Sequence, residues 1–239
     1  MTINVKIETF LSANHNKLLN SQKLLDLCLI FDILEVIEKR VHILEQYFTN
    51  NENLKSERRI IKYTYGSVSY EFISDNGVFS KNKIDYGSRV LLDTYLKNKK
   101  EVHNFLDVGC GYGFLSIVLS RSLGISGVGV DVNRRALKLA LENAKLNHVN
   151  IEFIESNIYE NVDGLFDLII TNPPIRAGKR IVLEILKGAR EHLNLNGELW
   201  FVIRKDQGAK SVINELNALY KIEILEKSKG FYVIVAKKN

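Results

Sequence analysis

The chain has 239 residues and a net charge of +5, and its 46% hydrophobic and 26% charged side chains exclude a disordered protein. Its two cysteines, Cys28 and Cys110, are too few and too far apart for a disulfide framework or a metal cluster, which indicates a reducing, cytoplasmic setting. No run of about 18 apolar residues is free of charge, so we expect no membrane span.

Residues 20–48 predict a long amphipathic helix. Their apolar side chains recur at spacings of three and four from Leu24 to Leu44. A polar stretch follows, and no chemistry is recognisable in residues 1–57. We therefore expect residues 1–57 to be a helical N-terminal extension that packs on the fold or on a partner, including as a homodimer element. Residues 58–239 are the predicted main domain.

Two further elements are expected before the main alternation begins. Residues 60–74 alternate in polarity around Gly66-Ser67, which predicts a β-hairpin. Asp85 or Ser88 is placed to cap a helix that runs to about Asn98.

From residue 103 onward, apolar strands alternate with helices, which indicates a parallel sheet covered on both faces. The last two strands have only Ser228 to Gly230 between them, too few for a parallel crossover, so they must form an antiparallel hairpin. The predicted fold is α/β, a doubly wound seven-stranded sheet with an antiparallel last strand. The expected strands are 104–109, 127–132, 151–155, 166–171, 198–204, 221–227 and 231–236, and the helices 113–123, 133–147, 178–194 and 207–219.

A glycine-rich turn follows the first strand of this alternation. Its pattern is Asp107-x-Gly109-x-Gly111-x-Gly113, which differs from the dinucleotide spacing G-x-G-x-x-G. Glycines allow a sharp turn and a close approach of a ligand to the backbone. Ligands of such sheets bind beyond the carboxyl ends of the strands. The alternative is a tight turn with only a structural role.

Two polar residues at the ends of the next strands fit a nucleoside. Asp131 ends the second strand, where a carboxylate accepts hydrogen bonds from both hydroxyls of a ribose. It could instead only cap the next helix together with Asn133. Asn157 follows the third strand, where an amide could contact the edge of an adenine, with a simple loop turn as the alternative.

The glycine turn and the acid on the second strand resemble the class I S-adenosylmethionine-dependent methyltransferases, whose sheet also carries an antiparallel strand. The resemblance covers about residues 105–237 and implies a Rossmann-like fold with S-adenosylmethionine as the cofactor. By this resemblance the turn from Asp107 to Gly113 passes the methionine half, Asp131 holds the ribose and Asn157 contacts the adenine.

The fourth strand ends in Asn172-Pro173-Pro174-Ile175, which suits transfer to an exocyclic amine. The lone pair of such an amine is delocalised, and two acceptors aimed at its N–H groups favour the pyramidal, reactive geometry. The Asn172 side-chain oxygen and the Pro173 carbonyl can supply them. Proline has no N–H and a fixed φ, and it also forces the preceding residue to be extended. The alternative is that the two prolines only end a strand.

Three segments narrow the resemblance to the small-subunit (16S) ribosomal RNA guanine-N2 methyltransferases. They are VFSKNKIDYGSRVLL, NPPIRAGK and RKDQGAKS, and the similarity covers about residues 60–239. It implies that Asp85 and Ser88 border the methionine end of the cofactor. Ile175 departs from the aromatic residue that amino-methylating relatives often have, which slightly disfavours adenine and glutamine targets.

Two basic clusters follow the fourth and fifth strands and should rim the same crevice. Residues 59–239 hold 26 of the 33 basic side chains, which makes this region the better candidate to meet a polyanion. There the clusters could contact phosphates that flank an extruded base, or they could be a solvated basic face. The predicted RNA-binding residues are Arg176, Lys179, Arg180, Arg204, Lys205 and Lys210.

These observations predict an enzyme that methylates an exocyclic amine of RNA, namely guanine N2 in 16S ribosomal RNA. Its partner would be ribosomal RNA or the small ribosomal subunit. The alternatives are a methyltransferase acting on DNA adenine or protein glutamine, or a non-catalytic RNA-binding factor that keeps the fold. No metal ligands are expected.

Overall fold

The computed structural model describes residues 54–239. The predicted helix over residues 20–48, and with it the homodimer element, lies outside the described residues. The boundary between residues 57 and 58 therefore stays a prediction. No helix within residues 54–239 has both the length and the hydropathy that a transmembrane segment requires.

The predicted hairpin is present and forms a separate two-stranded sheet. Its strands are β1 (Arg59–Tyr65) and β2 (Val68–Ser74), which pair antiparallel with Tyr63 opposite Tyr70. The connecting Gly66 has a φ of 58°, a backbone angle that residues with a side chain rarely adopt.

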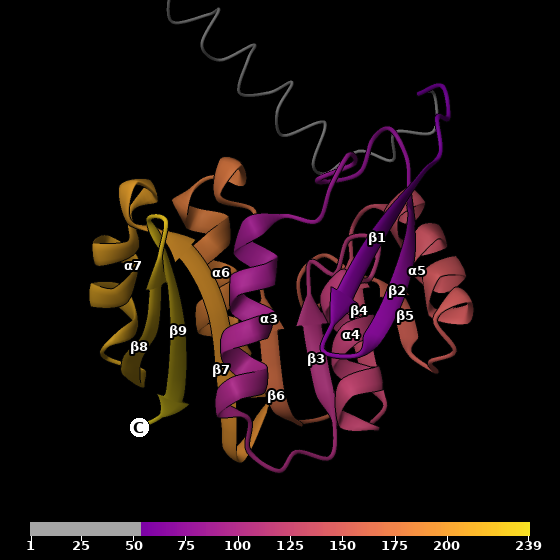
Figure 1. Ribbon diagram of the computed structural model, residues 1–239. Coiled ribbons are helices and arrows are strands. Elements are labelled where there is room, and N and C mark those ends of the chain that lie inside the picture. Colours follow the sequence, from indigo (N-terminus) through magenta and orange to yellow (C-terminus); the bar gives the residue numbers. More distant parts are fainter. Residues whose placement is uncertain (1–53) are drawn as a thin grey trace, which may run out of the picture. The chain divides into compact units, whose positions relative to one another are not determined.

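The main sheet has seven strands in the order β5-β4-β3-β6-β7-β9-β8 (Figure 1). The strands are β3 (Phe105–Val108), β4 (Gly127–Asp131), β5 (Glu152–Glu155), β6 (Phe166–Thr171), β7 (Leu193–Arg204), β8 (Tyr220–Ser228) and β9 (Phe231–Lys238). All neighbouring pairs are parallel except those that involve β9, which is antiparallel to both β7 and β8. The predicted fold class is confirmed. The insertion of β9 between β7 and β8 was not predicted.

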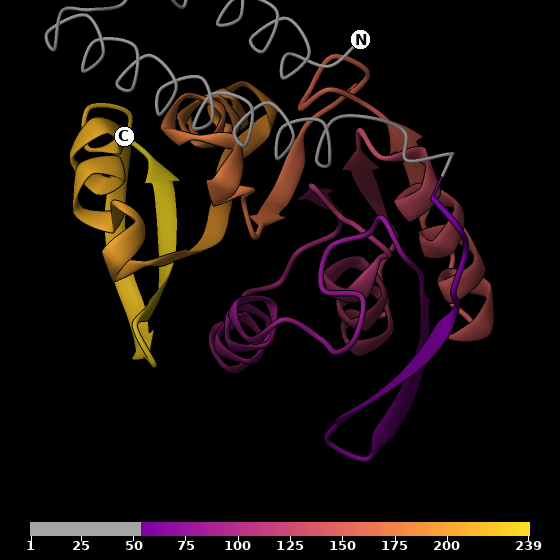
Figure 2. The ribbon, with the colours of Figure 1, turned by 90° about the horizontal axis from the view of Figure 1, so that it is seen from above.

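Helices cover both faces of the sheet, because each central strand alternates between two cores. Phe105 of β3 belongs to the core beneath the hairpin and α3, α4 and α5, whereas Leu106 belongs to the core beneath α6 and α7. Figure 2 shows α3 and α4 on one side of the strands and α6 and α7 on the other. The helices are α3 (Tyr86–Asn98), α4 (Phe114–Leu123), α5 (Arg134–Leu146), α6 (Lys179–His192) and α7 (Ala209–Leu216).

The chain moves outward from β3 in two directions, through β4 to β5 and from β6 to β7. The strand order therefore reverses between β3 and β6, and sheets of this type bind ligands at that point. Asp107 to Gly113 follow β3, and Asn172 to Ile175 follow β6. The topology thus brings the two predicted halves of the site together.

Four helices, α4 to α7, begin later than the sequence pattern indicated, and three of them follow a glycine. Helices α4, α6 and α7 begin directly after Gly113, Gly178 and Gly208, whose φ values are 90°, 98° and 88°. A residue with such a φ cannot continue a right-handed helix, so each glycine separates the helix from the segment before it. Short 3-10 turns, η2 (Ile175–Ala177) and η3 (Lys205–Gln207), lie ahead of α6 and α7.

Strand β7 begins at Leu193 rather than at the predicted residue 198. Leu193 pairs with Phe166 ahead of a shift in register, and Glu198 pairs with Leu168 after it. Gly197 lies within this irregularity, where a Cβ atom would come within 2.7 Å of the Phe166 carbonyl oxygen. The close approach of the two backbones needs a glycine at this bulge.

Asn143 of α5 joins the hairpin to the turn after β3. Its Oδ1 accepts from the Ile73 N–H at 2.7 Å, and its Nδ2 donates to the carbonyls of Ile73 and Tyr112 at 3.0 and 2.9 Å. The side chain is fully buried.

Replacing Asn143 by alanine is expected to lower the free energy of unfolding by about 3 kcal/mol, because three backbone groups lose their partner. Urea denaturation would measure the loss. As a control, Asn98→Ala at the exposed end of α3 should cost less than about 1 kcal/mol. Equal losses in the two variants would contradict this role for Asn143.

Candidate active site

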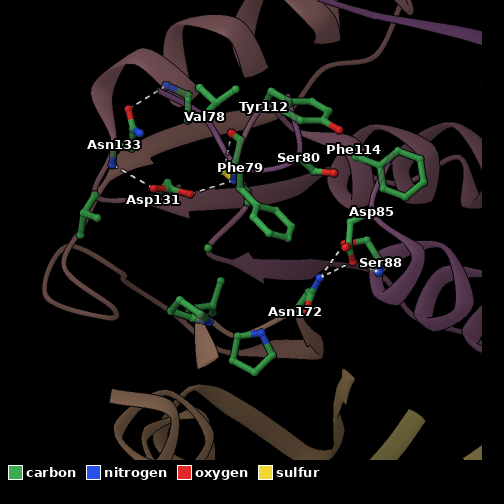
Figure 3. A pocket seen from close by; sticks show the side chains of 18 of the residues that line it. Val78, Phe79, Ser80, Asp85, Ser88, Tyr112, Phe114, Asp131, Asn133 and Asn172 are labelled. Atoms are coloured by element: carbon green, nitrogen blue, oxygen red, sulfur yellow. Dashed lines mark hydrogen bonds between the residues drawn. The ribbon is translucent and has the colours of Figure 1, made fainter. Parts of the chain in front are cut away.

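A cavity of about 1040 Å³ lies at the carboxyl ends of β3, β4 and β6 (Figure 3). Most of the residues that were predicted to bind the cofactor or to take part in catalysis line this cavity. Those residues are Asp85, Ser88, Gly109, Gly111, Asp131, Asn157, Asn172, Pro173, Pro174 and Ile175. Arg176 and Arg204 lie on the same walls.

Asp107 and Gly113 lie behind the cavity wall. The Asp107 Oδ2 atom accepts from the Ser116 N–H at 3.1 Å and from its hydroxyl at 2.5 Å, which ties β3 to the start of α4. A Cβ atom on Gly113 would lie 3.2 Å from the Cβ of Ala140, so this glycine lets α4 approach α5 closely. Both residues position the turn, although the sequence placed them among the cofactor contacts.

Asp107 gives the fold a pH dependence of unusual sign. Burial raises the pKa of its carboxyl from 3.8 to about 7, against the two Ser116 hydrogen bonds. The folded chain therefore holds a proton that the unfolded chain loses between about pH 4 and pH 7. The Asp107 contribution to stability should fall across that window by at most about 1.4 kcal/mol per pH unit, and level off above it.

Urea denaturation of the wild type and of Asp107→Asn across that pH range would measure the contribution as the difference between the two curves. The asparagine variant keeps an acceptor for Ser116 and lacks the titration. Parallel curves from pH 4 to pH 7 would contradict the prediction.

The turn after β3 presents its backbone to the cavity. Gly109 and Gly111 have φ values of 74° and 56°, and a Cβ atom on either would meet no other heavy atom within 4 Å. The N–H groups of Gly109 and Cys110 both donate to the Val130 carbonyl, at 2.8 and 3.0 Å, which holds the turn against β4. A ligand can therefore pass within van der Waals contact of the turn.

Asp131 is held by backbone N–H groups on both sides. Its Oδ2 accepts from Gly111 at 2.8 Å and its Oδ1 from Asn133 at 2.9 Å. Burial raises the pKa of Asp131, while these backbone hydrogen bonds oppose that shift. Each oxygen retains acceptor capacity toward the cavity, which suits two adjacent hydroxyl donors. Asn157 lies at the exposed mouth, where its Nδ2 donates to Glu160 at 2.8 Å and its Oδ1 stays available.

The side-chain amide of Asn172 has one defined orientation. Its Nδ2 donates to the Asp85 Oδ2 at 3.0 Å and to the Ser88 hydroxyl at 2.9 Å (Figure 3). Because a carboxylate only accepts, the amide nitrogen must face Asp85 and the amide oxygen must face away from it. Asp85 is itself fixed, since it caps α3 by accepting from the Ser88 N–H at 2.9 Å.

The carbonyl groups of the two prolines differ in their hydrogen bonds. The Pro174 carbonyl accepts from the Ala177 N–H at 2.9 Å and so belongs to η2. No donor within residues 54–239 bonds to the Pro173 carbonyl. The strand before them is anchored, because the Thr171 hydroxyl donates to the Val108 carbonyl at 2.7 Å and joins β6 to β3. The site thus contains two free acceptors on adjacent residues, Asn172 Oδ1 and Pro173 O.

The segment from Asn76 to Lys81 is a cavity wall whose residues were not among the predicted site residues. Phe79 is 51% exposed and, in Figure 3, its ring lies in the cavity between Asp131 and Asn172. An apolar pair, Val78-Phe79, within an otherwise polar turn region was the available signal. An exposed aromatic ring in a cavity offers apolar contact to a ligand.

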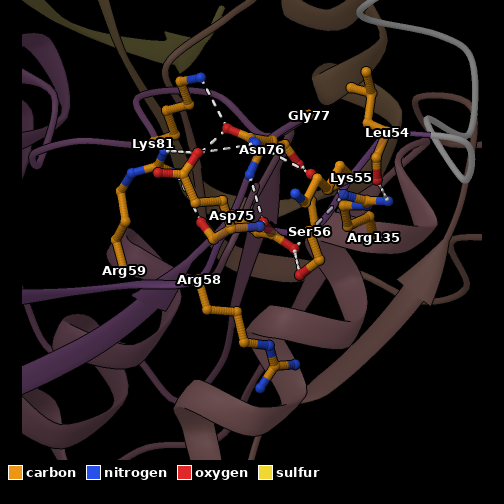
Figure 4. Close-up of polar contacts among 12 residues, drawn as sticks. Leu54, Lys55, Ser56, Arg58, Arg59, Asp75, Asn76, Gly77, Lys81 and Arg135 are labelled. Atoms are coloured by element: carbon orange, nitrogen blue, oxygen red, sulfur yellow. Dashed lines mark hydrogen bonds and ion pairs between the residues drawn. The ribbon is translucent and has the colours of Figure 1, made fainter.

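This wall is fixed at its start by Asp75 (Figure 4). The carboxylate accepts from the Ser56 hydroxyl at 2.7 Å and from the Glu57 N–H at 2.5 Å, and it pairs with Arg135 at 3.6 Å. At the next residue, the Asn76 carbonyl accepts from Arg135 at 3.1 Å. The chain before β1 and the start of α5 therefore hold the Phe79 segment in place.

The predicted RNA-binding residues differ in their surroundings. Arg204 forms a two-pronged pair with Asp206, with both contacts at 2.9 Å. Lys179 pairs with Glu215 at 3.4 Å, and Arg180 pairs with Glu184 at 3.6 Å. Arg176, Lys205 and Lys210 are exposed and make no ion pair within residues 54–239.

The fold and this cavity define a class I methyltransferase. Gly109 and Gly111 line the cavity and leave open space where a Cβ would stand, and Asp131 offers two acceptor oxygens. The walls therefore fit an adenosine ligand with an extended chain. The chain belongs to the methyltransferase small domain family, which it matches over residues 69–235. The cofactor of this class is S-adenosylmethionine, as the sequence predicted.

The curated relatives differ in the activity that their names give. The uncharacterized Bacillus subtilis protein YbxB is 41% identical over 199 residues, which cover 81% of this chain and 98% of that protein. A putative protein N5-glutamine methyltransferase of Methanocaldococcus jannaschii is 36% identical over 54% of this chain and 77% of its own length. The ribosomal RNA small subunit methyltransferase C of Yersinia pseudotuberculosis is 35% identical, and the chain spans 41% of its length.

Solved structures agree on the fold. The T. thermophilus 16S rRNA N2-guanine methyltransferase RsmC, in complex with AdoMet and guanosine, matches 78% of this chain and 52% of its own, with a TM-score of 0.69 and 24% identity. A ribosomal protein L11 methylase from Lactobacillus delbrueckii matches 70% of this chain and 84% of its own, with a TM-score of 0.60 and 23% identity.

Proposed function

We propose that this protein transfers a methyl group from S-adenosylmethionine to an exocyclic amine of RNA, the N2 of guanine in 16S ribosomal RNA. The observation that carries the proposal is the fixed amide of Asn172. Asp85 and Ser88 occupy its nitrogen, so its oxygen is presented as an acceptor beside the free Pro173 carbonyl. A pair of fixed acceptors matches the two N–H bonds of an amine.

The cofactor would lie along the turn after β3, and when bound it supplies a methyl group carried on a positively charged sulfur. The open backbone at Gly109 and Gly111 would accommodate it, the two oxygens of Asp131 would accept from the ribose hydroxyls, and Asn157 would contact the adenine edge. Asp85 and Ser88 would border its methionine end on the side of Asn172.

Asn172 and Pro173 act on the target amine. Accepting both N–H hydrogens draws the nitrogen out of its planar geometry and directs its lone pair away from the two acceptors, toward the side where the methyl donor would lie. The acceptors are aligned before the substrate arrives, so no reorganisation is needed at the moment of reaction. The methylated nitrogen then gives up one proton to water. Neither a side-chain nucleophile nor a metal ion is required by this arrangement.

Charge and similarity favour RNA as the substrate. Arg176 and Arg204 lie at the cavity wall, and Lys205 and Lys210 are exposed nearby on η3 and α7, where they would contact phosphates that flank an extruded base. Lys179 and Arg180 at the start of α6 would add to this contact by exchanging their carboxylate partners for phosphates. The Yersinia relative is named as a ribosomal RNA small subunit methyltransferase, and the T. thermophilus structure as a 16S rRNA methyltransferase, and both names point to ribosomal RNA or the small subunit as the partner.

Protein glutamine is the second candidate substrate, and it rests on the name of the Methanocaldococcus relative. The side-chain amide of glutamine presents the same planar NH₂ group to Asn172 and Pro173. Ile175 at the fourth position of the motif offers apolar packing without an aromatic face, and the basic wall favours a polyanion over a peptide. A non-catalytic factor would have no need for two aligned acceptors.

Methyl transfer can be followed with S-adenosylmethionine labelled in its methyl group, using 16S ribosomal RNA, assembled small subunits and total protein as substrates. After digestion, mass spectrometry identifies the modified unit. We expect N2-methylguanosine from one of the two RNA substrates. Label found only in N6-methyladenosine or in glutamine would overturn the guanine assignment, and no label in any substrate would overturn the enzyme assignment.

A further inference from the structure

Aromatic and basic side chains gather where the tip of the β8–β9 hairpin meets the start of α3. The Tyr86 and Phe231 rings lie 5.6 Å apart, and the Tyr86 and Ser228 hydroxyls are 2.7 Å apart. Figure 1 shows this tip at the end of the sheet where α3 begins. We call this surface the aromatic–basic ridge, and it consists of Tyr86, Arg89, Lys229 and Phe231.

The cations of the ridge lie over aromatic rings. The Lys229 Nζ atom is 4.9 Å and the Arg89 Cζ atom 5.4 Å from the centre of the Tyr86 ring. A ring attracts a cation without neutralising it, so these contacts hold the charged groups in place and leave them positive.

Neither ridge cation is paired with a carboxylate in the part of the chain that the structure describes. Arg89 and Lys229 are both exposed and make no ion pair there. Arg204 and Lys179, by contrast, each face a carboxylate. The ridge can therefore bind an anion without first displacing a carboxylate of the protein.

The ridge is continuous with the candidate active site. Tyr86 directly follows Asp85, whose carboxylate holds Asn172, and Phe231 lines the cavity itself. Helix α3 packs on the opposite face of the sheet from α6, where the predicted residues Lys179 and Arg180 lie. A strand whose target nucleotide enters the cavity thus has basic surface on both sides of its entry point.

We propose that the aromatic–basic ridge binds backbone phosphates of the RNA strand that carries the target nucleotide. Extruding one base requires that the flanking backbone be held, and compact cations fixed in advance hold it with little loss of side-chain freedom. This inference deepens the proposed function and rests on RNA being the substrate.

Two substitutions remove charge from the ridge while preserving the fold. Lys229 and Gly230 have φ values of 48° and 80°, the pattern of a type I′ hairpin turn, so Lys229→Asn creates the preferred Asn-Gly sequence. Arg89→Gln acts on an exposed position of α3. The matched control is Lys97→Gln, an exposed position in the last turn of the same helix.

Fluorescence anisotropy with an unstructured labelled oligoribonucleotide at several salt concentrations gives the slope of log Kd against log salt. We expect the Lys229→Asn, Arg89→Gln double variant to reduce that slope by about 1.4, roughly 0.7 per lost phosphate contact, and to bind about tenfold more weakly at low salt. Lys97→Gln should match the wild type. Affinity for S-adenosylmethionine, measured by calorimetry, should be unchanged in all three proteins.

A salt slope in the double variant equal to that of the wild type would overturn the ridge proposal, as would a loss seen only with an acidic peptide as the probe. The binding assay does not depend on which base is methylated. A reduced slope combined with label on a nucleotide other than guanine would therefore sustain the ridge and overturn only the guanine assignment.

Discussion

Replacing Asn172 by alanine is expected to lower the rate of methyl transfer by about 10²- to 10³-fold, the size of effect seen when one preorganised polar group is lost. The alanine removes one of the two acceptors for the target amine. It leaves Gly109, Gly111 and Asp131 untouched, so affinity for S-adenosylmethionine should change by less than about threefold. Turnover measured with labelled cofactor and calorimetric titration would separate the two quantities.

A graded pair of variants tests whether orientation of the amide matters. Ser88→Ala removes one of the two acceptors that hold the Asn172 nitrogen and keeps the Asp85 carboxylate. We expect a loss of turnover of about tenfold, between the wild type and Asn172→Ala. Asn172→Ala with the turnover of the wild type would refute the acceptor mechanism, and Ser88→Ala as inactive as Asn172→Ala would point to a direct role for Ser88.

Much of the fold could be predicted because its signals are local. Apolar runs separated by helical periodicity indicate a parallel sheet wherever they occur, and the two residues between β8 and β9 permit only a hairpin. The place of β9 between β7 and β8 was not local information. It depends on which strand of the hairpin pairs with β7. The structure shows that this strand is β9, with Trp200 opposite Val235.

The site was predictable where a motif lies within one turn and less so where distant segments meet. Gly109 and Asn172 each carry their own signature in a few consecutive residues. The contact from Asn172 to Asp85 spans 87 positions, and the Phe79 wall is fixed by groups both before β1 and within α5. No periodicity reports such contacts, which follow from how the loops are anchored.

The number of basic residues also did not predict which of them are free to bind an anion. Lys179 and Lys187 of α6 both reach Glu215 of α7, because the two helices pack side by side on one face of the sheet. Lys229 was not among the predicted RNA-binding residues, yet its charge lies over the Tyr86 ring and makes no ion pair within residues 54–239. Tertiary packing therefore determines which basic side chains are paired with carboxylates, and the net charge of +5 does not contain that information.

Replacing Asp131 by alanine is expected to weaken binding of S-adenosylmethionine by about 10²- to 10³-fold. A hydrogen bond to a charged group is worth about 1.5 to 3 kcal/mol, and the carboxylate has two oxygens for the two ribose hydroxyls. The same carboxylate also accepts from the N–H groups of Gly111 and Asn133. The variant could therefore lose affinity by loosening the turn rather than by losing the ribose.

A double-mutant cycle between protein and ligand distinguishes these two causes. S-adenosylhomocysteine and an analogue that lacks both ribose hydroxyls are titrated into the wild type and into Asp131→Ala. If the carboxylate binds the ribose, removing the hydroxyls should cost the wild type about 10²-fold and cost the variant almost nothing. Equal costs in the two proteins would show that Asp131 acts only on the turn, and the ribose would then need another partner in the cavity.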